Sequence, residues 1–154
     1  MPEQIEYQRL LAGLRQAGLR LTPQRLAIAQ TLAGNRSHPT AQALHKRLHD
    51  RLPSLSLATV YNTLDRLAEL GLVFELGPAP DGSVHYDADP TPHFNLICTS
   101  CGKIEDVKGP AKPPRLQQVS LWAGYDIRGA RLVYYGLCPT CRQTHKSQKR
   151  RKAS

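Results

Sequence analysis

All four cysteines of this 154-residue chain fall into two Cys-x-x-Cys pairs, and this arrangement constrains the fold more than any other feature. Thirty-six residues lie between the pairs. Two thiolates on one tight turn can bind one side of a zinc ion, and a second such turn completes a closed tetrahedral shell. The spacing therefore predicts a structural zinc site that joins two distant segments through Cys98, Cys101, Cys138 and Cys141.

Two other uses of the cysteine pairs are open, a redox motif and disulfides. A redox Cys-x-x-Cys is expected near the start of a βαβ unit and not in duplicate. Disulfides are disfavoured in the cytoplasm, where we expect the chain to act. That expectation rests on the lack of an apolar run of roughly 20 residues and of a signal peptide at the N-terminus, so no membrane partner is expected either.

The net charge of +9 favours a polyanionic partner, but it is unevenly distributed. Residues 1–78 carry nine basic and six acidic side chains, residues 79–141 carry six of each, and residues 142–154 carry six basic and no acidic ones. Like charges without apolar residues among them predict a disordered basic tail over 142–154. Such a tail either aids solubility or serves as an auxiliary nucleic-acid arm.

The first seventy residues show the start and stop signals of four helices. Thr22 followed by Pro23 is a helix start, in which the hydroxyl caps the first turn and Pro occupies the first helical position. Ser56 is a second N-cap, and Gly71 follows the last turn of the helix that Ser56 opens. The expected helices cover residues 5–17, 23–34, 38–52 and 57–70.

Two short strands joined by a Pro/Gly turn follow the helices, at residues 72–76 and 83–87. Helices followed by such a hairpin outline a winged helix-turn-helix, whose last helix enters the DNA major groove. Helical triplets also occur as plain packing domains, and this alternative is open.

The second half mixes strands with one helix, which predicts a small α+β domain and an α+β fold class for the chain. A polar, proline-bearing stretch before it suits a hinge. The expected elements are strands at 94–98, 103–107 and 127–137 and a helix at 114–123. The predicted parts are a winged-helix domain at 1–87, a hinge at 88–92, a metal-binding domain at 93–141 and the tail at 142–154.

Histidine and carboxylate side chains gather on both sides of the expected hinge. His85 and Asp87 are two apart on one strand and so share a face, as do His93 and Asn95 on the next; Asp106 closes the strand after that. Nitrogen and oxygen ligands of this kind suit Fe(II), Mn(II) or Zn(II). Taken singly, each residue is equally explained as a surface or hydrogen-bonding group.

Together these motifs resemble the ferric uptake regulator superfamily, bacterial metal-dependent transcription regulators, over nearly the whole chain. The residues that carry the resemblance are Arg20–Arg25, His38–Ala41, Ala58–Leu64, His93–Ile104 and Tyr135–Cys141. The resemblance implies a homodimer with an N-terminal winged-helix DNA-binding domain and a C-terminal dimerisation domain that contains the four-cysteine zinc site. Metal binding in such proteins closes the dimer around a palindromic operator in double-stranded DNA.

The resemblance also implies particular site residues. A regulatory metal is expected on His38, Asp87, His93, Asn95 and Asp106. Tyr61 matches a recognition-helix tyrosine that meets bases, and Arg20 matches a basic residue that reaches the minor groove. The DNA-binding residues expected on and before that helix are Ser56, Ala58, Thr59, Tyr61 and Asn62.

The two aspartates Asp87 and Asp106 are closer to the peroxide-sensing branch of the family, called PerR, than to the iron-sensing branch, which usually has glutamates there. In the PerR mechanism, bound Fe(II) reacts with peroxide and oxidises a ligating histidine, here His38 or His93. The alternative is an iron or manganese uptake regulator without peroxide sensing. Asn95 departs from the family histidine, which tilts the site toward Mn(II) or leaves it short of one ligand, and His85 is a candidate additional ligand.

Two rival functions come from other classes. A zinc-dependent enzyme would need an open zinc position and a nearby general base, and four thiolates count against it. A zinc-stabilised protein-interaction module would have no DNA affinity at physiological salt. The sequence favours a regulator that is not an enzyme.

Overall fold

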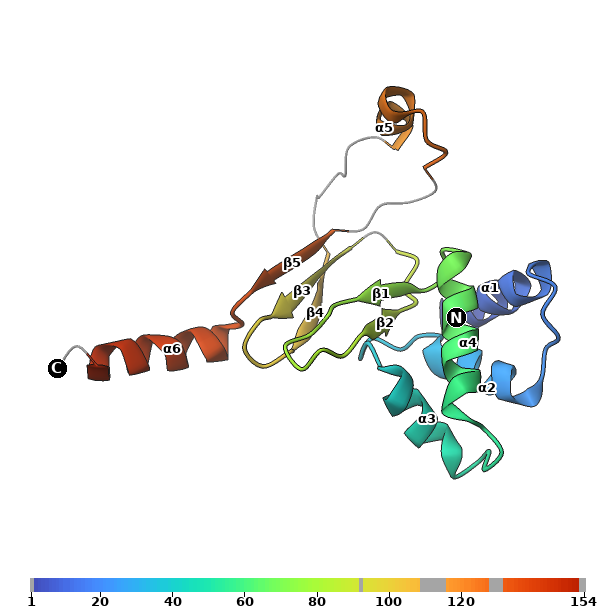
Figure 1. Ribbon diagram of the computed structural model, residues 1–154, viewed down its shortest axis with the longest axis horizontal. Helices are drawn as coiled ribbons and strands as arrows, with labels where there is room; N and C mark the ends of the chain where they lie inside the picture. The colour runs from blue at the N-terminus through green and yellow to red at the C-terminus, as the bar shows by residue number, and fades with distance from the viewer. Residues whose placement is uncertain (1, 92, 109–115, 128–131, 153–154) are drawn as a thin grey trace. The chain divides into compact units, whose positions relative to one another are not determined.

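The computed structural model describes residues 2–91, 93–108, 116–127 and 132–152. The chain divides into two compact units (Figure 1). The first unit is Met1–Leu76 with Val84–Thr91, and the second is Gly77–Ser83 with Pro92–Ser154. The hairpin that follows the helices therefore contributes its strands to the first unit, while its turn belongs to the second.

The predicted α+β fold class is confirmed, since helices dominate the first unit and a sheet forms the second (Figure 1). None of the helices in the described ranges is long and apolar enough to cross a membrane. The elements are α1 (Pro2–Gln16), α2 (Pro23–Leu32), α3 (Ala41–His49), α4 (Leu57–Glu69), β1 (Phe74–Leu76), β2 (His85–Asp87), β3 (Phe94–Cys98), β4 (Ile104–Val107), α5 (Leu116–Ala123), β5 (Val133–Gly136) and α6 (Pro139–Lys152).

Three helices of the first unit begin at capping hydroxyls. The side chains of Thr22, Thr40 and Ser56 accept hydrogen bonds from the backbone N–H three residues later, at 3.3, 3.1 and 3.1 Å. Each bond satisfies one of the N–H groups that a helix leaves unpaired at its start. The predicted caps at Thr22 and Ser56 are confirmed, and Gly71 follows α4 with a φ of +66°, a conformation that glycine adopts without steric cost.

The apolar faces of α1 to α4 meet in one core. Its fully buried side chains recur at helical spacing along each helix, as the sequence pattern predicts. The most deeply buried are Leu10, Leu14, Ile28, Leu32, Leu44, Val60, Leu64 and Leu67.

The second unit contains a three-stranded sheet in the order β4-β3-β5 (Figure 1). Strands β3 and β4 are antiparallel, with Asn95 opposite Asp106, whereas β3 and β5 are parallel, with Cys98 opposite Gly136. A parallel pair needs a long crossover connection, and the segment containing α5 supplies it. This topology brings together chain segments that are far apart in sequence.

Several element boundaries differ from those expected. Helix α1 starts at Pro2 instead of Ile5, and α3 starts after its Thr40 cap instead of near His38. The strand expected at 127–137 is described over Val133–Gly136, because residues 128–131 lie outside the described part of the chain. The same is true of residues 114–115 at the start of the expected helix.

The expected disordered tail is wrong up to Lys152, because α6 continues from Pro139 to that residue. Proline is well placed as the first residue of a helix. The stretch that follows is rich in Gln, Lys and Arg, which are good helix formers. Cations are also favourable near the negative end of the helix dipole. Together these effects outweigh the repulsion between like charges on which the expectation of disorder rested.

A buried carboxylate fixes α1 to the loop after α2. Glu6 is buried, and its two oxygens accept hydrogen bonds from the Arg36 side chain and from the Gly34 N–H, both at 2.7 Å. Burial opposes ionisation of Glu6, but these hydrogen bonds outweigh it and hold the pKa of the carboxyl below its ordinary value of 4.5. Arg36 also contacts Asp89 at 3.3 Å, so the same guanidinium reaches the segment that follows β2.

We predict that Glu6→Gln destabilises the protein by about 1 to 2 kcal/mol at pH 7, since Arg36 is partly exposed and solvent weakens the pair. Because the folded pKa of Glu6 is lowered, its stabilisation is complete above pH 4.5 and is lost as the pH falls through the folded value. Urea unfolding of both proteins from pH 7 to pH 3 measures this. The control is Glu3→Gln at an exposed position of α1, and an equal loss in both variants would contradict the assignment.

Candidate metal centre and nucleic-acid interface

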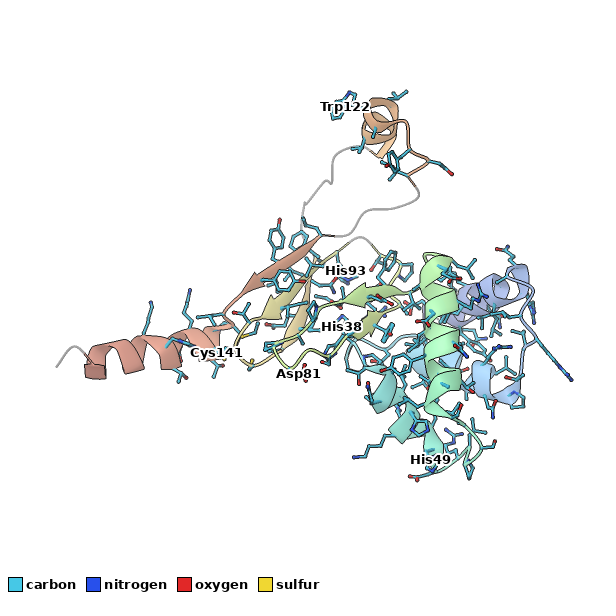
Figure 2. All side chains as sticks on the ribbon, in the orientation of Figure 1. His38, His49, Asp81, His93, Trp122 and Cys141 are labelled. Atoms are coloured by element: carbon cyan, nitrogen blue, oxygen red, sulfur yellow. The ribbon has the colours of Figure 1, made fainter. Side chains whose placement is uncertain are left out.

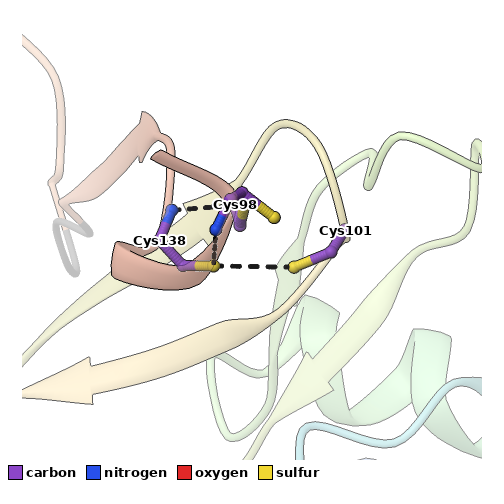
Figure 3. A group of neighbouring side chains, drawn as sticks. Cys98, Cys101 and Cys138 are labelled. Atoms are coloured by element: carbon purple, nitrogen blue, oxygen red, sulfur yellow. Dashed lines mark hydrogen bonds between the residues drawn. The ribbon is translucent and has the colours of Figure 1, made fainter. Parts of the chain in front are cut away.

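The four cysteines converge at one end of the β3–β5 pair. Parallel pairing sets Cys98 opposite Gly136, two residues before Cys138. Four Sγ atoms lie within 4.8 Å of one another, and the Sγ atoms of Cys101 and Cys138 are 3.9 Å apart (Figure 3). In the first Cys-x-x-Cys turn, Gly102 has a φ of +74° and its N–H donates to the Cys98 carbonyl at 2.9 Å, which closes the turn.

Backbone N–H groups stabilise the thiolate form of Cys98. The Cys138 N–H donates to Cys98 Sγ at 3.3 Å, and with those of Cys101 and Ser100 it lowers the pKa of the Cys98 thiol to about 6. At Cys141 a hydrogen bond with Ser100 lowers the pKa, but the neighbouring thiols outweigh it and raise the pKa to about 12. One thiol therefore ionises readily, while another resists ionisation beside it.

Opposite pKa shifts at Cys98 and Cys141 are expected for thiols this close together, because neighbouring negative charges repel each other. A divalent cation at the centre removes this repulsion and keeps all four thiols deprotonated. Four sulfur ligands favour zinc in a tetrahedral, closed structural site. The predicted zinc ligands are therefore brought together, and their geometry and chemistry fit a structural zinc ion.

Three of the predicted regulatory ligands meet on the same sheet. Asn95 is fully buried and lies opposite Asp106, and its amide Nδ2 donates to Asp106 Oδ1 at 2.8 Å. The Nε2 of His93 lies 3.6 Å from the same carboxylate oxygen and 3.3 Å from the Asn95 amide nitrogen. His93, labelled in Figure 2, has a buried side chain. The antiparallel register explains why residues eleven apart form one cluster.

In the first unit the other two predicted ligands, His38 and Asp87, are both buried. An antiparallel bridge joins Thr40 to His85, and the Tyr86 N–H donates to the Pro39 carbonyl at 3.0 Å. This isolated bridge joins the segment before α3 to β2, the strand whose last residue is Asp87.

His85, the candidate additional ligand, has a specific contact. Its Nδ1 lies 2.6 Å from the backbone carbonyl of His38. His38 has a φ of +49°, in the left-handed region that non-glycine residues seldom adopt. One nitrogen of the His85 ring thus contacts the backbone of His38.

The expected DNA-reading residues lie on and before α4. Ser56, Ala58 and Asn62 are exposed, and Thr59 and Tyr61 are half-buried. Tyr61 and Asn62 follow Ala58 by three and four residues, and these spacings place each of them beside Ala58 on the helix surface. The side chains of Ser56 and Thr59 contact each other at 2.8 Å. Arg20, on the loop between α1 and α2, is also exposed.

One contact of this surface was not apparent from the sequence. The amide Nε2 of Gln42 on α3 donates to the hydroxyl of Tyr61 on α4 at 2.8 Å. The pair is nineteen residues apart and belongs to different helices, so no sequence spacing indicates it. The sequence also does not indicate the salt bridge between Asp89 and Arg36, because that contact depends on how the helices pack.

Comparison with known proteins shows similarity over almost the entire chain. Residues 16–135 match the model of the ferric uptake regulator family. The chain is 36% identical over 138 residues to the peroxide-responsive repressor PerR of Staphylococcus epidermidis, covering 90% of this chain and 91% of that protein.

Two solved structures are also similar to this chain. PerR from Streptococcus pyogenes, described in work on peroxide sensing and gene regulation, is 33% identical with a TM-score of 0.51, covering 88% of this chain and 92% of that one. The ferric uptake regulator from Pseudomonas aeruginosa, solved with manganese, is 27% identical with a TM-score of 0.64, covering 83% of this chain and 96% of that one.

We predict that Cys98→Ser removes zinc from the chain and unfolds the second unit at ordinary temperatures, because zinc binding to such a site supplies folding free energy. Native mass spectrometry checks the metal content, and hydrogen exchange of the backbone amides of β3, β4 and β5 reports on the second unit. Thr99→Ala, a change within the same turn that spares all four thiols, serves as the control. Retention of zinc and of slow amide exchange by Cys98→Ser would argue against a four-thiolate site.

Proposed function

The chain belongs to the ferric uptake regulator family, and from this membership we propose that it is a metal-dependent transcriptional repressor, not an enzyme, that senses peroxide in the manner of PerR. The observation that carries the proposal is the cluster of His93, Asn95 and Asp106, on and just before the strands that also lead into the zinc site. In the same chain, α4 presents a polar, capped helix suited to a DNA groove.

The proposed partner is double-stranded DNA, bound by a homodimer. Two-fold symmetry of the protein predicts a palindromic operator, with the α4 helix of each subunit in successive major grooves. Exposed apolar side chains on α5 and just after it suit burial against a second copy. They are Leu121, Trp122 (Figure 2) and Tyr125, each more than 70% exposed.

The domain roles follow from this proposal. Residues 1–87 would bind DNA, 88–92 would form the hinge, and 93–141 would dimerise and bind metal. The basic segment 142–154 is available to DNA phosphates in addition. A repressor of this kind acts in the cytoplasm, where the genome of a bacterium lies.

We propose a regulatory Fe(II) or Mn(II) ion on His38, Asp87, His93, Asn95 and Asp106. The donor types fit, because imidazole nitrogen with carboxylate and amide oxygen suits a borderline divalent ion. Such an ion can act as a switch only if it binds the DNA-competent form more tightly than the other. Ligands contributed by both units would meet that condition, since an ion that needs both favours one arrangement of them.

Peroxide sensing is supported by the aspartates Asp87 and Asp106 and by the similarity to peroxide-responsive repressors. A bound Fe(II) ion would supply the redox chemistry, by which peroxide transfers one oxygen atom to the ring of His38 or His93 and leaves as water; the oxidised ring would no longer be a good ligand, and the protein would release DNA. One residue favours the alternative of a manganese or iron uptake regulator. Asn95 supplies a harder oxygen ligand where the family has a histidine, and this tilts the preference toward Mn(II).

Operator binding under three metal conditions tests the proposal. A duplex selected from a random pool by the Mn(II)-loaded protein is measured with Mn(II), with Fe(II) and without metal, before and after peroxide. We expect tight binding with either ion and weak binding without one. After peroxide, binding should be lost in the Fe(II) sample, with one added oxygen on His38 or His93. Binding that persists would instead indicate an uptake regulator, and the absence of any selected duplex would refute DNA recognition.

We predict that His85→Ala weakens Mn(II) binding by about 10- to 100-fold, the range for loss of a group that supports a metal ligand. The reason is its contact with the His38 carbonyl. Titration of the full chain with Mn(II) measures the change. His49→Ala, at an exposed position at the end of α3, is the control, and an unchanged affinity in His85→Ala would exclude a role for His85 at the metal.

A further inference from the structure

The hydroxyl of Tyr61 is held by a neighbouring helix of the same unit. The Nε2 of Gln42, on the first turn of α3, donates a hydrogen bond to the Tyr61 hydroxyl at 2.8 Å. The ring of Tyr61 packs against the apolar core of the first unit, so the side chain is half-buried. The ring is thus fixed at its base by the core and at its tip by Gln42.

The direction of this bond sets the chemistry of Tyr61. A phenol has one proton to donate and lone pairs that accept. Because the Gln42 amide donates to the oxygen, the proton of Tyr61 is directed elsewhere. Tyr61 lies beside the exposed Ala58 on the surface of α4, so that proton is available to a group docked on this helix.

We propose that Gln42 is a positioning residue that makes Tyr61 a hydrogen-bond donor to the operator. This inference rests on the proposed DNA-binding function. The group on DNA must then be an acceptor, either a base atom in the major groove (purine N7, guanine O6 or thymine O4) or a phosphate oxygen. An amino group such as cytosine N4 cannot accept this proton. Gln42 would thus influence sequence preference without touching DNA.

The test is a double-mutant cycle in the full-length, Mn(II)-loaded protein on the duplex selected by the wild type. Gln42→Met keeps the length of the side chain and removes the donor. Gln42→Glu can only accept, so it draws the Tyr61 proton inward and adds a negative charge. Each change is made with Tyr61 intact and in a Tyr61→Phe background, where the phenol is absent and the effect of charge remains.

We expect Tyr61→Phe to weaken operator binding by about tenfold, the loss of one hydrogen bond. Gln42→Met should weaken it by a few-fold and Gln42→Glu by about tenfold when Tyr61 is present. In the Tyr61→Phe background, Gln42→Met should have no effect and Gln42→Glu only the part due to charge. Equal effects in both backgrounds would overturn the proposal.

Modified duplexes identify the acceptor. Purine N7 is removed with 7-deazapurines, guanine O6 is removed with 2-aminopurine, thymine O4 is weakened with 4-thiothymine, and single phosphates are neutralised as methylphosphonates. When the modified atom is the one that Tyr61 contacts, Gln42→Met should bind the duplex as tightly as the wild type does. A base modification that achieves this identifies base reading, and a methylphosphonate identifies a phosphate contact. If no modification of an acceptor abolishes the penalty, Tyr61 is not a donor to DNA.

Two controls separate failure of this inference from other failures. Zinc content and unfolding temperature of each variant must match the wild type, so that a loss of affinity is not a loss of fold. If the wild type selects no duplex, the proposed function itself fails. If it selects one and the cycle is additive, only the role of Gln42 is refuted.

Discussion

Four thiols within 4.8 Å of one another are the constraint on which the second unit depends. Without a cation their charges compete, as the opposite pKa shifts of Cys98 and Cys141 indicate. When zinc binds, the four thiolates would coordinate it and so join the end of β3 to the segment after β5. A small sheet of three strands has little apolar surface to bury, so such a metal cross-link contributes much of its stability.

Strand β3 makes this constraint relevant to regulation. Its last residue is the proposed zinc ligand Cys98, and three positions earlier it carries Asn95, which donates a hydrogen bond to Asp106. A bond at one end of a strand fixes its register, and a register shift of one residue would turn every side chain to the other face. A structural zinc ion would therefore keep Asn95 facing Asp106, so that the cluster with His93 is organised without a regulatory ion.

Local signals along the chain were sufficient to predict much of this molecule. The caps at Thr22 and Ser56, the end of α4 at Gly71 and the cysteine spacing each depend on residues close in sequence. The contacts that give the sites their character join distant residues, as Gln42 does with Tyr61 and His85 with His38. They depend on helix packing and strand register, which one sequence does not reveal.

The helical tail illustrates a different limit of sequence reasoning. The charge of residues 142–154 predicts disorder, but charge repulsion between exposed side chains is weak because solvent and salt screen it. The good helix propensity of Gln, Lys and Arg and the proline start at Pro139 act on every backbone hydrogen bond of α6. Local propensity therefore outweighs repulsion in this segment.

In the first unit, a short path joins the proposed metal ligands to the proposed reading helix. His38 lies two residues before Thr40, whose hydroxyl caps α3, and Gln42 on the first turn of that helix bonds Tyr61. The backbone of His38 is held by His85 on β2, whose last residue is Asp87. An ion bound by His38 and Asp87 would act on the metal end of this path. It would need no large movement to change DNA affinity, because a hydrogen bond such as that of Gln42 loses most of its strength when its geometry is disturbed. The energy that the ion contributes is bounded by its differential affinity for the two forms, and a complete switch requires a ratio of about 10⁴.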